Sequence, residues 1–109
     1  MRKAAVYRNG EFAGTLTEES RSSYVFRYED GWFRDAAKPA VSLTLPKAQQ
    51  EYHATTLFPF FSNLLSEGAN RKLQSMRLKI DEADSFGLLL ATAQDDTAGA
   101  VTVRPLTEE

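Results

Sequence analysis

The sequence contains no cysteine and a single histidine, His53, among its 109 residues. The lack of cysteine excludes disulfide bonds, thiolate metal ligands and cysteine nucleophiles. It also fits a reducing compartment, so we expect a cytoplasmic protein. One histidine cannot form a usual zinc site without distant carboxylates, so no metal is expected. His53 could share a face with Glu51 on an extended segment, but a surface histidine in a loop between a strand and a helix is the favoured interpretation.

The sequence also lacks a long apolar run and an excess of positive charge. No apolar run approaches the roughly 20 residues that a membrane helix needs, and none follows Arg2 and Lys3, so neither a membrane partner nor a signal peptide is expected. The 13 basic and 15 acidic residues give a net charge of −2, which makes direct nucleic-acid binding unexpected. The nearest approach to a basic cluster is typical of a solvated helix face; it consists of Arg71, Lys72, Arg77 and Lys79.

The motifs of common enzymes are missing too. Phosphoryl transfer requires a phosphate cradle, a metal-holding residue and a positioned base, and no sequence of that kind is visible. Asp81, Glu82 and Asp84 do not have the spacing of a calcium loop, and Asp84 is better explained as a helix cap. Asp95 and Asp96 fit a turn. We therefore expect no catalytic, cofactor-binding or metal residues, and a protein that is not an enzyme.

What is present is the pattern of one soluble domain over residues 1–109, with 42% apolar residues. Alternating apolar and polar residues predict strands at 23–28 and 40–45, and further strands are predicted at 4–7, 11–16 and 99–104. Asn9 and Gly10 predict a type I′ hairpin turn between the first two strands, and Gly14 predicts a bulge or a close backbone approach. Pro46 and Pro105 are expected to end the strands that precede them.

The period changes to that of a helix from about residue 54. Thr55 or Thr56 is the expected N-cap, Pro59 fits the first turn, and Gly68 is expected just past the end. This helix carries one apolar stripe, in which Phe61 and Leu64 should be core and Phe58 lies at the margin; the stripe consists of Leu57, Phe60, Phe61, Leu64 and Leu65.

Two further helices follow. One is expected over 69–78, with Leu73, Met76 and Arg77 on one side, and one from Asp84, which carries Phe86 and several leucines. The predicted fold class is therefore α+β, with an antiparallel sheet of about five strands and two or three helices packed on one side. Helices gathered on one side bury one face of such a sheet.

The aromatic pair Trp32-Phe33 follows a turn at Asp30-Gly31 and allows two interpretations. The rings belong to the core, which is favoured for a lone tryptophan in a small domain. Alternatively, they form an exposed anchor, because Trp and Tyr are enriched in interface hot spots.

Several segments, taken in order, resemble the N-terminal subdomain of HipA-like serine/threonine kinase toxins. They are Tyr7-x-Asn9-Gly10-x-x-x-Gly14-x-Leu16, Phe26-x-Tyr28-x-x-x-Trp32, Pro39-x-x-Ser42-Leu43-x-Leu45-Pro46, Phe58-x-x-Phe61-x-Asn63-Leu64-Leu65-x-Glu67-Gly68, Asp84-x-Phe86-x-Leu88-Leu89 and Asp96-x-x-Gly99-Ala100-Val101. Each segment is weakly specific alone, but their shared order and spacing cover nearly the whole chain.

The resemblance implies a component of a toxin–antitoxin system without catalytic residues. In full-length toxins this subdomain packs on the kinase core, and in three-component HipBST systems a separate small protein of this kind neutralises a shortened kinase. The expected partner is thus a HipA-like kinase that lacks this subdomain, with a helix-turn-helix DNA-binding antitoxin as a second one. A small-ligand or nucleic-acid binding module, or a truncated subdomain without independent function, stays open as an alternative.

The predicted partner interface combines the aromatic pair with polar residues around the end of the first long helix. It consists of Trp32, Phe33, Asn63, Ser66, Glu67 and Arg71. In the alternative interpretation, Asn63 and Ser66 only cap the helix end, and Glu67 and Arg71 form an i,i+4 ion pair worth a few tenths of a kcal/mol.

Overall fold

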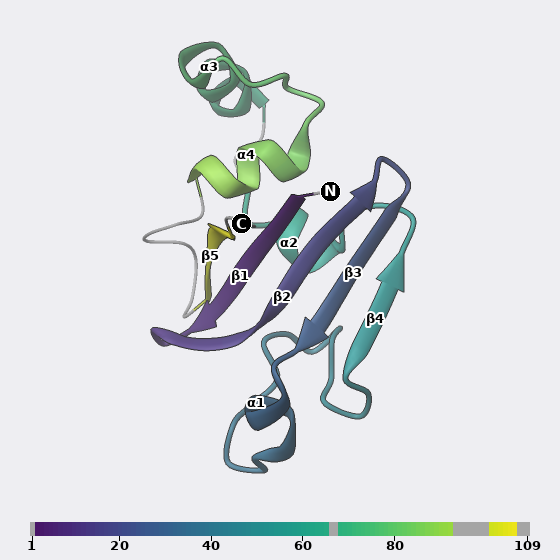
Figure 1. Ribbon diagram of the computed structural model, residues 1–109. Helices are drawn as coiled ribbons and strands as arrows, with labels where there is room; N and C mark the ends of the chain where they lie inside the picture. Colours follow the sequence, from purple (N-terminus) through teal and green to yellow (C-terminus); the bar gives the residue numbers. More distant parts are fainter. Residues whose placement is uncertain (1, 66–67, 93–100, 107–109) are drawn as a thin grey trace.

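Five antiparallel strands form one sheet in the order β4-β3-β2-β1-β5 (Figure 1). The fold is that of a computed structural model, which describes residues 2–65, 68–92 and 101–106. The strands are β1 (Arg2–Arg8), β2 (Glu11–Ser20), β3 (Ser23–Tyr28), β4 (Glu51–Ala54) and β5 (Val101–Leu106). The predicted α+β class with a sheet of about five antiparallel strands is confirmed.

The first hairpin forms as predicted. Asn9 and Gly10 have φ angles of 53° and 80°, the positive values that a type I′ turn requires at both central positions. Val6 pairs with Gly14 while Tyr7 pairs with Phe12, so β2 contains one extra residue and is bulged. A Cβ on Gly14 would lie 2.6 Å from the carbonyl oxygen of Arg27. Both features predicted for Gly14, the bulge and the close approach, are therefore present.

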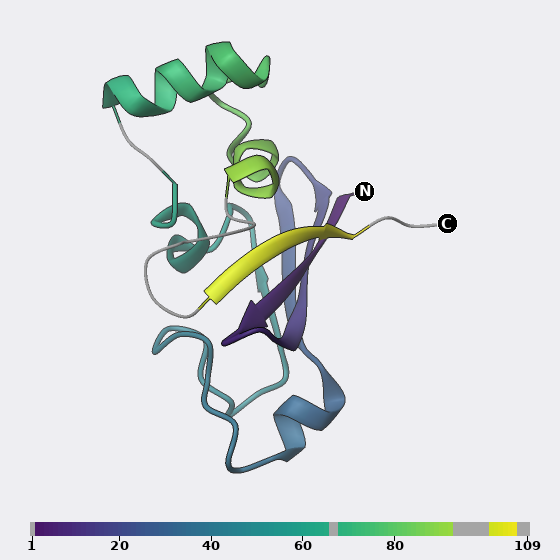
Figure 2. The same cartoon turned by 90° about the vertical axis from the view of Figure 1, so that its left-hand side faces the viewer.

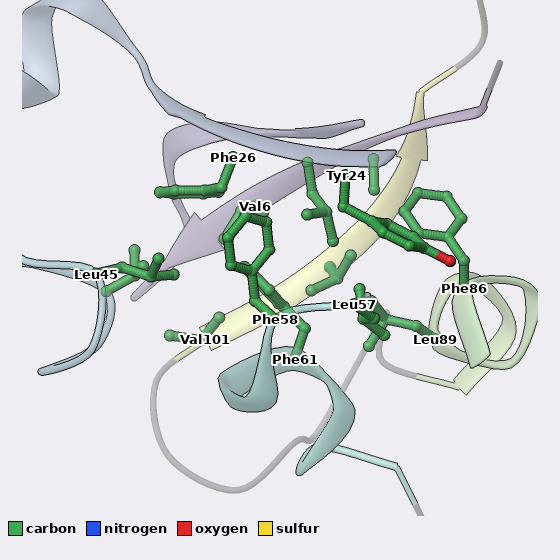
Figure 3. Packing of buried hydrophobic residues seen from close by; sticks show 14 of the residues in the cluster. Val6, Tyr24, Phe26, Leu45, Leu57, Phe58, Phe61, Phe86, Leu89 and Val101 are labelled. Carbon is green, nitrogen blue, oxygen red and sulfur yellow. The ribbon is translucent and has the colours of Figure 1, made fainter. Parts of the chain in front are cut away.

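One face of the sheet is buried under other parts of the chain, and the alternation of buried and exposed side chains along β3 shows which face this is. Tyr24, Phe26 and Tyr28 are buried, whereas Val25 is partly buried and Arg27 is exposed. The Phe26 ring lies 4.8 Å from the Tyr28 ring and 5.7 Å from Phe61 between centroids. Figure 3 shows this aromatic core between the sheet and the helices.

The predicted strand at 40–45 is wrong. Val41 and Leu45 are buried, but Leu43 is 98% exposed, because this segment is a turn in which Leu45 N donates to Ser42 O (3.1 Å). The Tyr28 hydroxyl holds both ends: it accepts from Val41 N (3.0 Å) and donates to Leu45 O. Apolar residues at every second position fit such a turn as well as a strand, since only its ends need to be buried.

The fourth strand lies instead at β4, immediately after this turn. Tyr52 pairs with Phe26 and His53 pairs with Val25 of β3. His53 is therefore a strand residue and not the loop residue that we predicted, although it is exposed as expected.

Two short helices differ from the prediction. The turn expected at Asp30-Gly31 is a helix, α1 (Asp30–Arg34), because the Glu29 side chain accepts from Trp32 N (2.9 Å) and caps it. The first long helix is reduced to α2 (Pro59–Ser62), which has Phe58 and neither threonine at its N-cap position. β4 extends to Ala54, so the chain is still extended where the helix was expected to begin.

The next two helices occur where they were predicted, as α3 (Gly68–Leu78) and α4 (Ser85–Thr92). Gly68 begins α3 and does not end the helix before it. Asp84 caps α4 as expected, since its Oδ1 accepts from Gly87 N (3.0 Å). Pro105 lies inside β5, a position tolerated because β5 is an edge strand. Asp95, Asp96 and residues 99–100 lie outside the described residues.

The helices α2, α3 and α4 lie on the same side of the sheet (Figure 2). α2 and α4 bury its inner face: Phe61, Phe86 and Leu89 are 0% exposed. Leu64, the other predicted core residue of the stripe, is partly buried and packs against the same core. Among the helices of the described residues, none has the length and apolar character needed to cross a membrane.

Candidate functional site

α3 carries the most exposed pair of apolar side chains on any helix that the structure describes. Leu73 is 61% and Met76 is 69% exposed. They lie one turn apart on the helix, as predicted, and Arg77 beside them is exposed too. In both views α3 extends beyond α4, away from the sheet (Figures 1 and 2). The pair therefore faces away from the core of the domain.

The opposite side of α3 is attached to the segment that leads into α4. Arg71 Nη2 donates to Glu82 O (2.8 Å) and to Ser85 Oγ (2.9 Å), and its Nε donates to Glu82 O as well (3.1 Å). The Ser75 hydroxyl donates to Ile80 O. These bonds fix the orientation of α3, so that its apolar pair is presented outward.

The structure describes two of the four predicted polar interface residues. Asn63 is exposed at the C-terminal end of α2, where its backbone N–H donates to Pro59 O (2.9 Å). Arg71 lies on α3 and faces α4. Ser66 and Glu67 lie outside the described residues, as does the predicted pairing of Glu67 with Arg71. Asn63 thus caps α2, whereas Arg71 belongs to α3.

The aromatic pair after β3 is mostly internal. Trp32 is 5% exposed, its Nε1 donates to Pro39 O (2.9 Å), and the Lys38 ammonium lies 5.3 Å from its ring. Phe33 is partly buried against the core. The core interpretation therefore fits Trp32. Phe58, which we expected at the margin of the apolar stripe and available to a partner, is only 7% exposed and belongs to the core.

A charged cluster joins β1 to α4 at the edge of a hollow of about 610 Å³. Arg2 Nε donates to Glu18 Oε1 (2.7 Å), and the two Nη atoms donate to the Asp84 carboxylate (3.0 and 2.8 Å). The Tyr24 hydroxyl donates to Glu18 Oε2 (3.1 Å), and the Arg2 guanidinium lies 5.2 Å from the Phe86 ring. These residues come from three strands and one helix.

Pairing and burial shift the pKa values of Asp84, Arg2 and Tyr24. The hydrogen bond from Arg2, joined by that from Gly87 N, lowers the pKa of Asp84 below its usual value. The hydrogen bond to Asp84 raises the pKa of Arg2. Burial raises the pKa of Tyr24, and its hydrogen bond to Glu18 adds to this. Each of these four groups is bonded to another member of the cluster, which therefore acts as a clamp between the strands and the start of α4.

Sequence reasoning found half of this clamp. Asp84 was predicted as a helix cap, but its partner Arg2 is 82 positions away and carries no local signal. Gly87 is part of the same arrangement, because a Cβ there would overlap the Asp84 carboxylate and lie 3.2 Å from Arg2 Nη1. Asp81 makes a local turn by accepting from Ala83 N (2.8 Å). Within the described ranges, no three acidic or histidine side chains gather as a metal site.

The uncovered face of the sheet has a shallower hollow of about 370 Å³, lined by residues of the four strands β1 to β4. His53 Nε2 lies 2.6 Å from Glu51 Oε2, so the two residues do share a face as the spacing allowed. The pKa of Glu51 is lowered, chiefly by this hydrogen bond and further by Arg27. The pair is exposed and solvated, which is typical of a surface ion pair.

A family model, the HipA N-terminal domain, matches residues 4–104. A solved structure described as the N-terminal domain of HipA toxin superposes with a TM-score of 0.74 and 28% sequence identity. The match covers 100% of this chain and 96% of that one.

Curated relatives fall into two kinds by length. An uncharacterized protein of Haemophilus influenzae is 34% identical over 104 residues, which cover 95% of this chain and 92% of that protein. Two proteins of Sinorhizobium fredii, "Putative kinase Y4mE" and "Putative kinase Y4dM", are 29% and 33% identical over 95% and 88% of this chain. The matched region spans only 24% and 25% of these two proteins. The chain belongs to the HipA N-terminal domain family.

Proposed function

We propose that this protein is a non-catalytic interaction protein of a toxin–antitoxin system, which binds a HipA-like serine/threonine kinase and keeps it inactive. The observation that carries the proposal is the shared domain. The same domain makes up about a quarter of two longer proteins that are named as kinases. A domain that packs on the rest of such a chain retains its packing surface when it is supplied separately.

The arrangement of charged groups supports a binding role. Arg2, Glu18 and Asp84 are engaged with one another, and the His53–Glu51 pair is exposed on the uncovered face of the sheet. The bonds of Arg2 hold β1, β2 and the start of α4 together, which is a structural role. We infer that the outward pair on α3 belongs to a surface that contacts another protein.

The kinase is the first proposed partner, and a helix-turn-helix DNA-binding antitoxin is the second. Contact with DNA then belongs to the antitoxin, because this protein has a net charge of −2. We propose that the protein acts in the cytoplasm, together with these partners.

The test is reconstitution with a HipA-like kinase that lacks this domain. The purified protein and the kinase should form a complex on gel filtration, and phosphoryl transfer from labelled ATP and Mg²⁺ should fall as the protein is added. The protein alone should give no transfer above a blank. Absence of a complex at micromolar concentrations contradicts the proposal, and a rise in kinase activity contradicts only its inhibitory part.

The hollow beside the Arg2 clamp favours a second candidate function, the binding of a small ligand. It is lined by both acidic and basic residues and has a volume of about 610 Å³, which is within the usual range of ligand sites. Arg2, Glu18 and Asp84 at its edge are already paired, so a ligand that binds to these residues must displace Arg2 from one of the two carboxylates. A metabolite that raises the melting temperature of the wild type but not of Glu18→Gln would support this candidate.

A further inference from the structure

α3 combines an exposed apolar pair with concentrated positive charge. Residues 68–79 contain four of the 13 basic residues of the chain and no acidic one. Lys72 and Arg77 are exposed directly beside Leu73 and Met76. The chain as a whole has a net charge of −2, so this helix is a local positive patch on an acidic protein.

The helix is also held in place. Arg71 bonds it to Glu82 and Ser85, and Lys79, with a φ of 56°, ends it in the left-handed conformation. A surface whose backbone is already fixed loses little conformational entropy when it binds. The exposed pair is therefore presented on a helix that these hydrogen bonds join to the start of α4, a favourable arrangement for an interface hot spot.

We propose that the outer side of α3, made of Lys72, Leu73, Met76 and Arg77, is the surface that docks on the kinase. Its complement is an apolar groove with an acidic rim: Leu73 and Met76 enter the groove, and Lys72 and Arg77 meet carboxylates at its edge. This inference rests on the proposed function, and it names the surface and the chemistry of the partner.

The same features argue against two other occupants. A nucleic acid backbone pairs with lysine and arginine but offers little to an exposed leucine and methionine at the centre of the patch. A lipid surface is bound by helices with a broad apolar face that often includes Trp or Phe. α3 has eleven residues and no aromatic residue. The groove of a folded protein, in contrast, offers contacts to both the apolar pair and the charged side chains of α3.

The test measures affinity for the HipA-like kinase that lacks this domain, by isothermal titration. Leu73→Gln with Met76→Gln should weaken binding about ten-fold or more, the effect of losing a hot-spot pair. Lys72→Glu with Arg77→Glu should also weaken it, and raising the salt concentration should reduce the difference between this variant and the wild type. Glutamine and glutamate are good helix formers, so α3 should persist in both variants.

Leu43→Gln is the matched control. Leu43 is 98% exposed in the turn that follows α1. α1 lies at the end of the sheet opposite to α3 (Figures 1 and 2). The control removes a leucine that is more exposed than Leu73, and this variant should bind like the wild type. Circular dichroism and melting temperature confirm that each variant is folded.

The possible outcomes are distinct. Wild-type binding together with unchanged affinity of the Leu73/Met76 variant overturns the α3 inference and leaves the proposed function standing. If only Leu43→Gln loses binding, the interface lies at the other end of the domain, and the α3 inference is again overturned. A wild type that does not bind the kinase overturns both proposals. The last outcome is that the wild type binds duplex DNA or anionic vesicles, that this binding requires Lys72 and Arg77, and that the charge variant keeps its affinity for the kinase. In that case the ligand of α3 is the DNA or the lipid surface, and the inferred protein groove is wrong.

Discussion

Two neighbouring helices of this domain, α4 and α3, use their apolar residues in opposite ways. On α4, Phe86, Leu88 and Leu89 are at most 1% exposed. On α3, which is the longer helix, Leu73 and Met76 are more than half exposed. Both helices were predicted from the sequence, and both carry apolar residues at helical spacing. The comparison shows that such spacing does not determine whether a helix packs against a core.

The difference lies in what attaches each helix to the sheet. Asp84 caps α4 and accepts hydrogen bonds from Arg2 of β1, and the Arg2 guanidinium also lies over the Phe86 ring. α3 is attached to the start of α4 through Arg71 and Ser85. Burial of a large apolar side chain stabilises a fold by roughly 1.5–3 kcal/mol, so α4 should contribute strongly to stability. α3 should contribute little and be available for binding.

The largest expected effect comes from truncating α4. Phe86→Ala should lower the free energy of unfolding by roughly 3–5 kcal/mol, because a fully buried ring leaves a cavity. Urea unfolding followed by circular dichroism measures it. Leu73→Ala is the matched change on α3 and should cost less than about 0.5 kcal/mol. Equal losses in the two variants would mean that α3 packs on the domain as α4 does.

A smaller loss is expected from the clamp that attaches α4. Asp84→Ala removes the N-cap, worth about 0.5–2 kcal/mol, and deprives Arg2 of one of its two carboxylate partners. Asp84→Asn keeps a capping side chain but no charge, and should cost less. The same urea experiment compares them. If both variants match the wild type, the anchoring of α4 does not depend on Asp84.

The clamp should also depend on pH. Arg2 lowers the pKa of Asp84 in the folded state, so the ionised carboxylate stabilises the fold above its unfolded pKa of about 3.9. This contribution disappears as the pH falls through the folded pKa. The stability difference between the wild type and Asp84→Asn should therefore be constant near neutral pH and shrink below about pH 4. Melting curves between pH 2.5 and 7 test this, and a difference that grows in acid would contradict the ion pair.

The smallest effect on stability should come from the outer side of α3. Leu73→Gln with Met76→Gln should change the free energy of unfolding by less than about 0.5 kcal/mol, because both side chains are largely exposed already. Thermal and urea unfolding give the value. A clear destabilisation would show that these residues pack within the domain, and it would weaken their assignment to an interface.

Much of the fold could be predicted because its signals are local. The Asn9-Gly10 turn needs residues that tolerate positive φ, and the alternation of Tyr24, Phe26 and Tyr28 marks one buried face. Asp84 could be recognised as a cap from its position before an apolar run. The fold class and the family resemblance were likewise confirmed.

The errors occur where a distant residue decides. The 40–45 segment alternates like a strand, but the Tyr28 hydroxyl gathers Val41 and Leu45 into a turn and leaves Leu43 outside. As a result the sheet takes its fourth strand from the segment of His53. For the candidate site, the sequence revealed the basic cluster of 71–79 but could not show that Leu73 and Met76 are exposed beside it.

The sequence by itself determined the hairpin, the inner face of β3, the two later helices and the family, because each depends on residues close together in the chain or on a shared pattern. Only the tertiary structure decided that Arg2 meets Asp84, that Leu43 is exposed while its neighbours are buried, and that α3 extends away from the core. These outcomes depend on which surfaces meet when the sheet and helices pack, and burial is a property of that packing and not of any local sequence.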